Sequence, residues 1–167
     1  MVPLEILEFP DPRLRTVAKS VKEVTGKIVA LADQMLEAMY EAPGVGLAAT
    51  QVNFHQRLIV IDVSETNHQP LILINPIIDS VEGEIETNEG CLSVPGFYEP
   101  VDRFQHIQLE ATGRDGEPFT MEASDLLAVC IQHEIDHLEG KLFVDYLSST
   151  KRQLIRKKLH KLQKQRA

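Results

Sequence analysis

Tryptophan is absent from this chain, and aromatic residues of all kinds make up only 5% of its 167 residues. Leucine, isoleucine and valine must therefore fill most of the core, which a chain of this length is able to bury as a single domain. No apolar run approaches the roughly 20 residues that a membrane-spanning helix requires. Residues 1–5 also lack the basic region and apolar run of a signal peptide. We therefore expect a cytoplasmic protein that is not bound to a membrane.

Cysteine is scarce too, and Cys91 and Cys130 are the two in the chain. In a reducing cytosol we do not expect them to form a disulfide, so each is a metal ligand, a nucleophile or a core thiol. Cys130 stands among Leu126, Val129 and Ile131 in the sequence. This apolar neighbourhood predicts that Cys130 is a buried thiol.

Acidic residues are missing from one end of the chain. Residues 151–167 contain eight Lys and Arg and no Asp or Glu, although the whole chain has a net charge of −8. Because this tail contributes +8, the other 150 residues carry a net charge of −16. Either the tail binds an anionic partner, or it is a solvated helix attracted to its own acidic body.

The same tail has helical periodicity. A helix is predicted over residues 149–166, with Ser149 or Thr150 as its N-cap. Its apolar stripe is narrow, which is typical of a helix that packs lightly on the body and turns its charges outward. The stripe consists of Leu154, Ile155, Leu159 and Leu162.

Helical and strand periodicities alternate along the rest of the chain. An amphipathic helix is predicted over residues 28–42, where Pro43 and Gly44 stop it. Its apolar face consists of Ile28, Leu31, Met35 and Met39. Strands are predicted over residues 57–63, 71–75, 77–85, 105–112 and 118–123, with a break at Pro76 and a turn at residues 113–118.

The most informative segment is His133-Glu134-Ile135-Asp136-His137, inside an apolar run that predicts a buried helix. Ser124 is the predicted N-cap of this helix, and Gly140 fits the position just past its end. Residues four apart lie on one helical face, so His133 and His137 are able to bind one metal ion. Glu134 is then placed to act as general base on a metal-bound water. The alternative is a pair of hydrogen-bonded core histidines.

A catalytic metal of this kind needs a third protein ligand. Downstream of the motif the candidates are poor, because Glu139 faces away, His160 lies in the basic tail and Asp145 follows the helix. Upstream, Cys91 lies in Glu-Gly-Cys-Leu-Ser, directly after a predicted strand, and a thiolate suits Fe(II) or Zn.

A glycine-rich segment, residues 44–51, follows the first helix. Glycines allow a backbone to approach a ligand closely, and the side-chain amide of Gln51 is able to donate a hydrogen bond to a developing oxyanion. Taken alone, the segment favours simple packing over a ligand-binding role. It is not a phosphate-binding loop, because it lacks the terminal Lys-Ser/Thr.

Taken together, the segments GVGLAATQ (44–51), EGCLS (89–93) and HEIDH (133–137) resemble peptide deformylase in composition, order and separation. The resemblance covers residues 3–148, and the combination is most similar to the bacterial cytoplasmic type with a helical C-terminal tail. We therefore expect an α+β fold in which mixed or antiparallel β-sheets pack around a central metal-binding helix, with an N-terminal and a C-terminal helix. The expected domains are a catalytic domain, 1–148, and a basic helical tail, 149–167.

The resemblance also implies roles for individual residues. Cys91, His133 and His137 would hold Fe(II), for which Zn, Ni or Co can substitute. Glu134 would be general base and later general acid, and the Gln51 amide and the Leu92 backbone N–H would bind the oxyanion. The residues expected near the substrate are Val45, Gly46, Thr87, Glu89, Gly90, Leu126, Val129 and Cys130. Some relatives carry an Arg a few residues after the Cys motif, where this chain has Gly96-Phe97-Tyr98-Glu99, with Arg103 beyond.

The implied reaction is hydrolysis of the formyl amide on the N-terminal methionine of nascent peptides, which releases formate. The basic tail is then expected to dock on the ribosome, and the protein is expected to be a monomer. Two other interpretations remain open at this point. A zinc endopeptidase of the His-Glu-x-x-His type shares the helix and the base, and a non-enzymatic metal- or ribosome-binding protein would need neither Glu134 nor Gln51.

Overall fold

The structure is a computed structural model, and it describes residues 3–166. In this range the fold is α+β, with one five-stranded antiparallel sheet of strand order β1-β2-β3-β4-β5 and three α-helices. The α+β class and the antiparallel pairing were predicted, but the strands form a single sheet rather than several. The elements are α1 (Gly26–Glu41), β1 (Gly46–Ala48), β2 (Leu58–Ile61), β3 (Leu71–Cys91), β4 (Val94–Thr112), β5 (Pro118–Ser124), α2 (Asp125–Leu138) and α3 (Ser149–Arg166). Short 3-10 helices cover Pro12–Arg15, Ala49–Val52 and Phe143–Tyr146.

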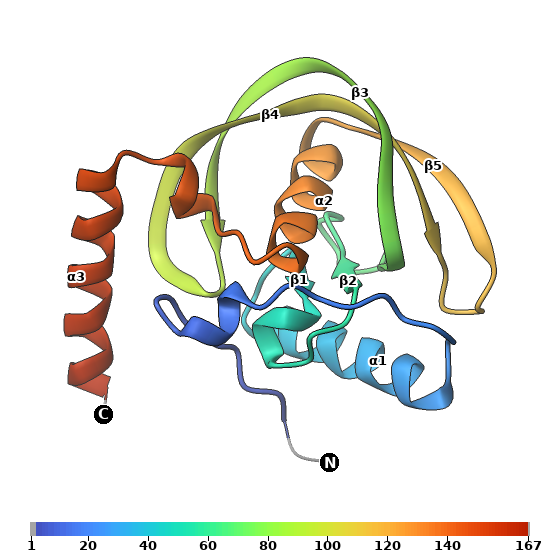
Figure 1. Cartoon of the computed structure of the whole chain (residues 1–167), viewed down its shortest axis with the longest axis horizontal. Coiled ribbons are helices and arrows are strands. Elements are labelled where there is room, and N and C mark those ends of the chain that lie inside the picture. Colours follow the sequence, from blue (N-terminus) through green and yellow to red (C-terminus); the bar gives the residue numbers. More distant parts are fainter. Residues whose placement is uncertain (1–2, 167) are drawn as a thin grey trace.

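The long strands β3 and β4 form a curved hairpin that arches over α2, with β5 along its outer edge (Figure 1). The turn of this hairpin is only two residues long, Leu92 and Ser93, and Cys91 pairs with Val94 across it. A tight turn between two long strands gives Cys91 a rigid place at the end of β3. Because β4 already begins at Val94, the strand predicted over residues 105–112 is only its second half.

The predicted break at Pro76 is wrong, since β3 continues through it. The register against β4 shifts between Ile74 and Ile77, so Pro76 lies at a β-bulge, where its missing N–H leaves no gap in the ladder. Asn75 has a φ of 53°, and its side chain hydrogen-bonds the backbone N–H and C=O of Val21 at 2.8 Å each. These two bonds offset the cost of the left-handed backbone at the bulge.

The helix α2 begins and ends as predicted, and it is buried under the arch of β3 and β4. Ser124 is its N-cap residue, as predicted, but the Ser124 hydroxyl hydrogen-bonds His106 at 2.6 Å and makes no capping bond to the helix. At the other end, Gly140 has a φ of 78°, and a β-carbon there would lie 2.6 Å from the carbonyl oxygen of Arg15. Only glycine fits this helix end.

The first helix, α1, packs its predicted apolar face against the core beneath β1 and β2. Thr25 caps it by accepting a hydrogen bond from the N–H of Ile28 at 3.4 Å. Only a few residues separate the end of α1 from β1. The apolar face of α1 therefore packs against the glycine-rich segment, in the same cluster as Leu47 and Ala49. None of the helices within residues 3–166 combines the length and hydropathy needed to cross a bilayer.

The C-terminal helix α3 lies at the side of the molecule and is joined to it by one narrow face (Figure 1). Ile155 and Leu159 are buried, whereas Leu154 and Leu162 of the predicted stripe are 49% and 45% exposed. The predicted caps are also wrong, because Ser148 caps the helix through the N–H of Lys151 at 3.2 Å. The remaining stripe is too narrow to bury both flanking leucines.

Polar contacts tie the far end of α3 to the N-terminal segment. Glu8 pairs with Arg166 at 2.5 Å and accepts a hydrogen bond from Gln163 at 3.1 Å. The hydrogen bond from Arg166 is the main cause that lowers the pKa of Glu8 below its ordinary value of 4.5. The stabilisation is therefore present above pH 4.5 and is lost as the pH falls through the lowered pKa.

Replacing Glu8 with Gln is accordingly expected to loosen the last turns of α3, since the ion pair is lost. Amide hydrogen exchange in residues 160–166 should become faster at pH 7, and wild type should approach the variant's rates as the pH falls below 4.5. Glu23→Gln, an exposed carboxylate on the body, is the control. Unchanged exchange in Glu8→Gln at pH 7 would show that the apolar face alone holds α3.

Candidate active site

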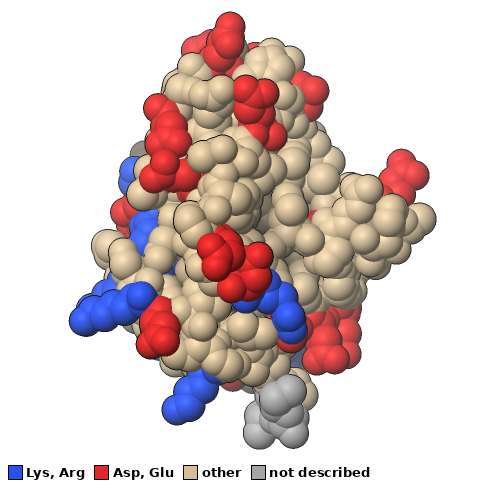
Figure 2. All heavy atoms as spheres, turned by 90° about the vertical axis from the view of Figure 1, so that its right-hand side faces the viewer, with Lys and Arg blue, Asp and Glu red and all other residues tan. Residues whose placement is uncertain are grey.

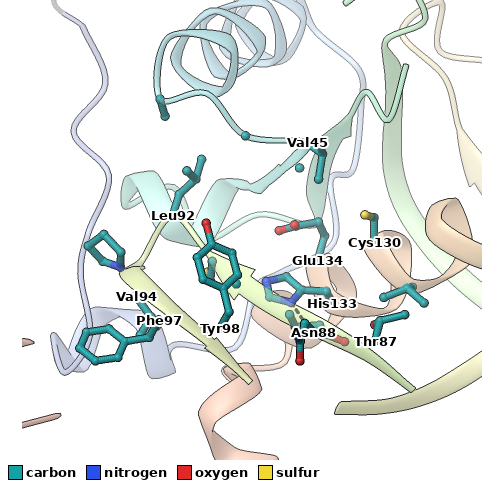
Figure 3. Close-up of a pocket in the computed structure, with 18 of the residues that line it drawn as sticks. Val45, Thr87, Asn88, Leu92, Val94, Phe97, Tyr98, Cys130, His133 and Glu134 are labelled. Carbon is teal, nitrogen blue, oxygen red and sulfur yellow. Dashed lines mark hydrogen bonds and ion pairs between the residues drawn. The ribbon is translucent and has the colours of Figure 1, made fainter. Parts of the chain in front are cut away.

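A cavity of about 580 Å³ is bounded by three parts of the chain. They are residues 42–46, called the segment after α1, the turn of the β3–β4 hairpin, and α2. Figure 3 shows residues from all three converging on it. All eight residues predicted near the substrate line this cavity, as do Cys91, Leu92, His133 and Glu134. The rest of its wall consists of residues that were not among the predicted site residues: Ala42, Pro43, Gly44, Asn88, Val94, Pro95, Gly96, Phe97 and Tyr98.

The three predicted metal ligands are brought together at one side of this cavity. The ligand atoms of Cys91, His133 and His137 all lie within 4.8 Å of one another. Nε2 of His137 lies 3.2 Å from Nε2 of His133 and 3.3 Å from Sγ of Cys91. The helix places the two imidazoles one turn apart, and the hairpin turn brings the sulfur to them.

This donor set fits a divalent metal ion. Tetrahedral ligands with ordinary Zn–N and Zn–S bond lengths lie roughly 3.4–3.6 Å apart, close to the spacing of these atoms. Burial lowers the pKa of His133, but the negative charges of Glu134 and Cys91 and the hydrogen bonds that Cys91 and Glu89 accept from the ring outweigh it, so the pKa is raised well above its ordinary range. Burial, followed by the positive charge of His133, lowers the pKa of His137 well below its ordinary range, so the pair of rings favours one positive charge rather than two. A metal cation would supply that charge in place of a proton.

Glu134 is the only carboxylate of the motif that faces the cavity. It is 5% exposed, and its Oε1 has no hydrogen-bond partner in the described part of the chain. Burial raises the pKa of Glu134 to about 7, although the positive charge of His133 opposes the shift. A carboxylate with a pKa near neutrality is able both to accept and to return a proton.

Gln51 lies beside the predicted ligand Cys91 and is 1% exposed. Its Oε1 accepts a hydrogen bond from the N–H of Ala48 at 2.8 Å, which fixes the orientation of the amide. Its Nε2 then donates to the hydroxyl of Ser93 at 3.0 Å and lies 3.5 Å from Sγ of Cys91. The amide N–H₂ is thus directed toward the predicted metal site.

A buried ionic network behind the metal ligands was missed by sequence reasoning. Nδ1 of His133 lies 2.8 Å from Glu89, which in turn accepts two hydrogen bonds from Arg103 at 2.6 and 2.8 Å. Arg103 also donates to Asp136 at 2.6 Å, and Tyr146 donates to the same carboxylate oxygen at 2.7 Å. A carboxylate that accepts a hydrogen bond from the second ring nitrogen of a ligand histidine fixes the tautomer and the orientation of that histidine.

No local sequence signal marks this network, since Arg103 lies fourteen positions beyond Glu89 and in the next strand. A buried arginine between two carboxylates is recognisable only when the register of β3 and β4 is known. The candidate ligands downstream of the motif are engaged elsewhere, because Glu139 pairs with Arg57 and Asp145 with Arg15.

Gly46 is the point where the glycine-rich segment approaches the base most closely. A β-carbon at this position would lie 2.5 Å from Oε2 of Glu134. Gly46→Ala is therefore expected to displace the carboxylate and to lower turnover on the order of 100-fold. The matched control is Gly26→Ala, because a β-carbon at Gly26 meets nothing within 4 Å. Turnover rates that are equal in the two variants would contradict a close fit of Gly46 to Glu134.

Comparison with known proteins decides the identity of the site. A family model described as polypeptide deformylase matches residues 3–153. The chain belongs to this family. It is 61% identical to a peptide deformylase of Teredinibacter turnerae and 58% identical to one of Pseudomonas aeruginosa, in each case over the full length of both chains. A crystal structure of a peptide deformylase from Legionella pneumophila matches with a TM-score of 0.94 and 45% identity, and covers 99% of this chain and 98% of its own.

The enzyme is therefore a metal-dependent hydrolase that removes the formyl group from N-terminal methionine, as the resemblance implied. A zinc endopeptidase is not favoured, because the relatives match this chain from end to end as deformylases. The upstream Cys91 also argues against an endopeptidase, since the third ligand of that class is usually downstream.

Proposed function

We propose that the cavity deformylates N-formylmethionyl nascent peptides, with Cys91, His133 and His137 as the ligands of a catalytic Fe(II) ion. The observation that supports this most directly is the convergence of these three side chains beside the buried carboxylate of Glu134. When bound there, a divalent metal would acidify a water molecule and polarise the formyl carbonyl. Zn, Ni and Co are the substitutes we expect to be accepted, because all of them bind thiolate and imidazole.

The protein's own groups divide the remaining work. Glu134 takes the proton of the attacking water and later delivers it to the leaving amine of methionine. The side-chain amide of Gln51 and the backbone N–H of Leu92 donate hydrogen bonds to the oxygen that becomes negative as water adds to the formyl carbon. Losing one such donor typically costs on the order of 100-fold or more in rate.

We place the methionine side chain of the substrate in the apolar part of the cavity. Val129 and Cys130 are buried there, and Val45 lines the same cavity from the segment after α1 (Figure 3). Burial raises the pKa of Cys130 to about 12, so its thiol stays neutral and apolar beside the substrate. The other residues assigned to this pocket are Gly46, Thr87, Glu89, Gly90 and Leu126.

The decisive experiment measures formate release from a formyl-Met peptide by protein purified anaerobically with Fe(II), beside an internally cleavable unformylated peptide. Formate without internal cleavage is the expected result. Internal cleavage without formate would replace the proposal with the endopeptidase. Metal-loaded, folded protein that gives neither product would leave a binding protein, and loading with Zn, Ni or Co in parallel ranks the metals.

We also propose that α3 docks the enzyme on the ribosome, close to the emerging nascent chain. Lys151 pairs with Glu99 and Arg166 with Glu8, whereas the six basic residues between them form no ion pair in the described part of the chain. On the face of the molecule opposite α3, most of the surface is uncharged, and acidic side chains cover more of it than basic ones (Figure 2). This separation of charge favours binding of ribosomal RNA phosphates through α3 alone.

Reversing three outward charges, Lys157→Glu, Lys158→Glu and Lys161→Glu, is expected to weaken ribosome binding about tenfold or more at low salt. The control reverses Lys22, Lys27 and Lys141 on the body, which changes the net charge equally. Co-sedimentation with ribosomes over a salt series measures both. Equal loss in the two triple variants, or binding that does not change with salt, would contradict docking through α3.

The proposal carries three further parts. Residues 1–148 form the catalytic domain, and residues 149–167 are the basic tail, of which α3 is the described part. The enzyme works in the cytoplasm, where formylated nascent chains are made. It works as a monomer, which sedimentation equilibrium at micromolar concentration would test.

A further inference from the structure

A second cavity, of about 410 Å³, lies between the arch of β3 and β4, the helix α2 and Tyr146 of the last 3-10 helix. Among the described residues, it shares none with the lining of the active-site cavity. Small-molecule sites in proteins typically enclose about 300–1,000 Å³. The second cavity is therefore large enough to hold a small ligand of its own.

The two cavities lie on different faces of α2. His133 and Glu134 line the active-site cavity, whereas Ile135 and Asp136 line the second one. Because successive helical residues are turned by about 100°, Ile135 lies roughly 160° around the helix from both His133 and His137. A molecule in the second cavity therefore does not reach the metal ligands.

Apolar side chains at the second cavity are left uncovered. Val81 and Phe104 are each 45% exposed, and Tyr146 is 51% exposed. Behind them, Ile78 and Ile135 are only partly buried and pack against the main core cluster. Exposed apolar surface that gathers at a hollow is typical of a binding site, whereas single exposed apolar residues are ordinary.

The charged side chains of the second cavity are mainly acidic. Glu84, Asp102 and Asp136 line it, together with one cation, Arg103. Arg103 already bonds Asp136 and Glu89, each at 2.6 Å, so its charge is used within the buried network. Within residues 3–166, neither Glu84 nor Asp102 forms an ion pair. These two carboxylates are available to a cation that enters the cavity.

The register of the hairpin adds a further negative charge beside the cavity. Glu86 of β3 lies directly opposite Asp102 of β4, and both are exposed. Like charges directly opposite each other on two strands destabilise the pairing. A bound cation would relieve this repulsion, whereas a bound anion would add to it.

We propose that the second cavity binds a small apolar amine, in which a primary ammonium group is carried by an aromatic ring or a short branched alkyl chain. The apolar part packs on Val81, Phe104 and Tyr146, and the ammonium group lies beside Glu84 and Asp102. Both parts of such a molecule are attracted, because carboxylates and aromatic faces each favour a cation. The active-site cavity stays open, so a formylated peptide and the amine bind at the same time.

The probe is phenethylamine, compared with phenethyl alcohol and phenylpropionate, which have a similar shape but are neutral and anionic. Each is titrated into isotope-labelled, full-length protein loaded with Zn, which is diamagnetic, and amide shifts are followed by NMR. Phenethylamine should shift the amides of Val81, Phe104 and Ile135, with a Kd in the millimolar range that suits so small a ligand. It should bind about fivefold more tightly than the alcohol, and phenylpropionate should bind most weakly. Added salt should reduce these differences.

Substitutions separate the local charges from the general acidity of the body. Glu84→Gln combined with Asp102→Asn keeps the shape of both side chains and should lower the affinity for the amine to that for the alcohol. The matched control, Glu82→Gln combined with Glu110→Gln, removes two exposed charges of the same strands outside the cavity and should keep the wild-type order of the probes. Val81→Lys should abolish binding of the amine and strengthen binding of phenylpropionate. Thermal unfolding of each variant checks that the fold is retained.

Several outcomes would overturn the proposal. Equal affinity for the three probes would be one, and equal affinity for the amine in wild type and in the Glu84→Gln, Asp102→Asn variant would be another. Shifts confined to Val45 and Leu126 would place the amine in the active-site cavity, and the absence of any shift in the millimolar range would exclude a site. Shifts at Ile135 that appear on raising the protein concentration alone would assign the cavity to a second copy of the chain. None of these measurements depends on formate release, so they test the second cavity separately from the proposed function.

Discussion

Replacing Glu134 with Gln is expected to lower formate release on the order of 10³-fold while the bound metal is retained. The amide has nearly the same shape as the carboxylate but accepts no proton from water, so general acid–base catalysis is lost and binding is not. Glu134 is suited to this role because its Oε1 has no hydrogen-bond partner in the described part of the chain and its Oε2 faces Gly46. The loss should appear in kcat, with little change in KM.

The control for this variant is Glu139→Gln, which removes a partly exposed carboxylate just past the same helix. Metal content by mass spectrometry should equal the wild-type value in both variants. If Glu134→Gln kept more than a tenth of the wild-type kcat with its metal in place, proton transfer would have to be assigned to another group. A loss of metal in that variant would instead identify Glu134 as part of the metal site.

Replacing Arg103 with Met is expected to reduce the free energy of unfolding by about 3–5 kcal/mol, because Glu89 and Asp136 would be left as buried charges without a partner. The side chain of Arg103 is 5% exposed, so water cannot take its place. The affinity for metal should also fall by about 10- to 100-fold, since Glu89 would no longer be held against Nδ1 of His133. Urea unfolding and competition with a chelator measure the two quantities.

A triple variant distinguishes the two effects. Adding Glu89→Gln and Asp136→Asn to Arg103→Met removes the unpaired charges, so much of the stability should return while the metal affinity stays low. Arg114→Met, which breaks the exposed pair with Asp33, is the matched control and should change neither quantity appreciably. Wild-type metal affinity in Arg103→Met would show that Glu89 is positioned without the arginine.

Much of the central helix was predictable from short-range patterns. Three signals identify α2 and its metal-binding face without knowledge of the fold: the apolar run, Gly140 and the His133–His137 spacing. Each of them depends only on residues within one or two helical turns. The same holds for α1, whose apolar face and stop signal are local. Ser124 occupies the predicted N-cap position, but its hydroxyl has two possible partners and bonds His106 across the sheet rather than an N–H of the helix.

The amino-acid sequence by itself thus determined the helices, the chemical types of the ligands and, through three motifs in order, the family to which the chain belongs. Only the tertiary structure decided the unbroken course of β3 past Pro76, the Glu89–Arg103–Asp136 network and the second cavity beside it. These features depend on the register between β3 and β4, which pairs residues far apart in the chain. Register is set by the packing of the whole arch over α2, and no local pattern contains that information.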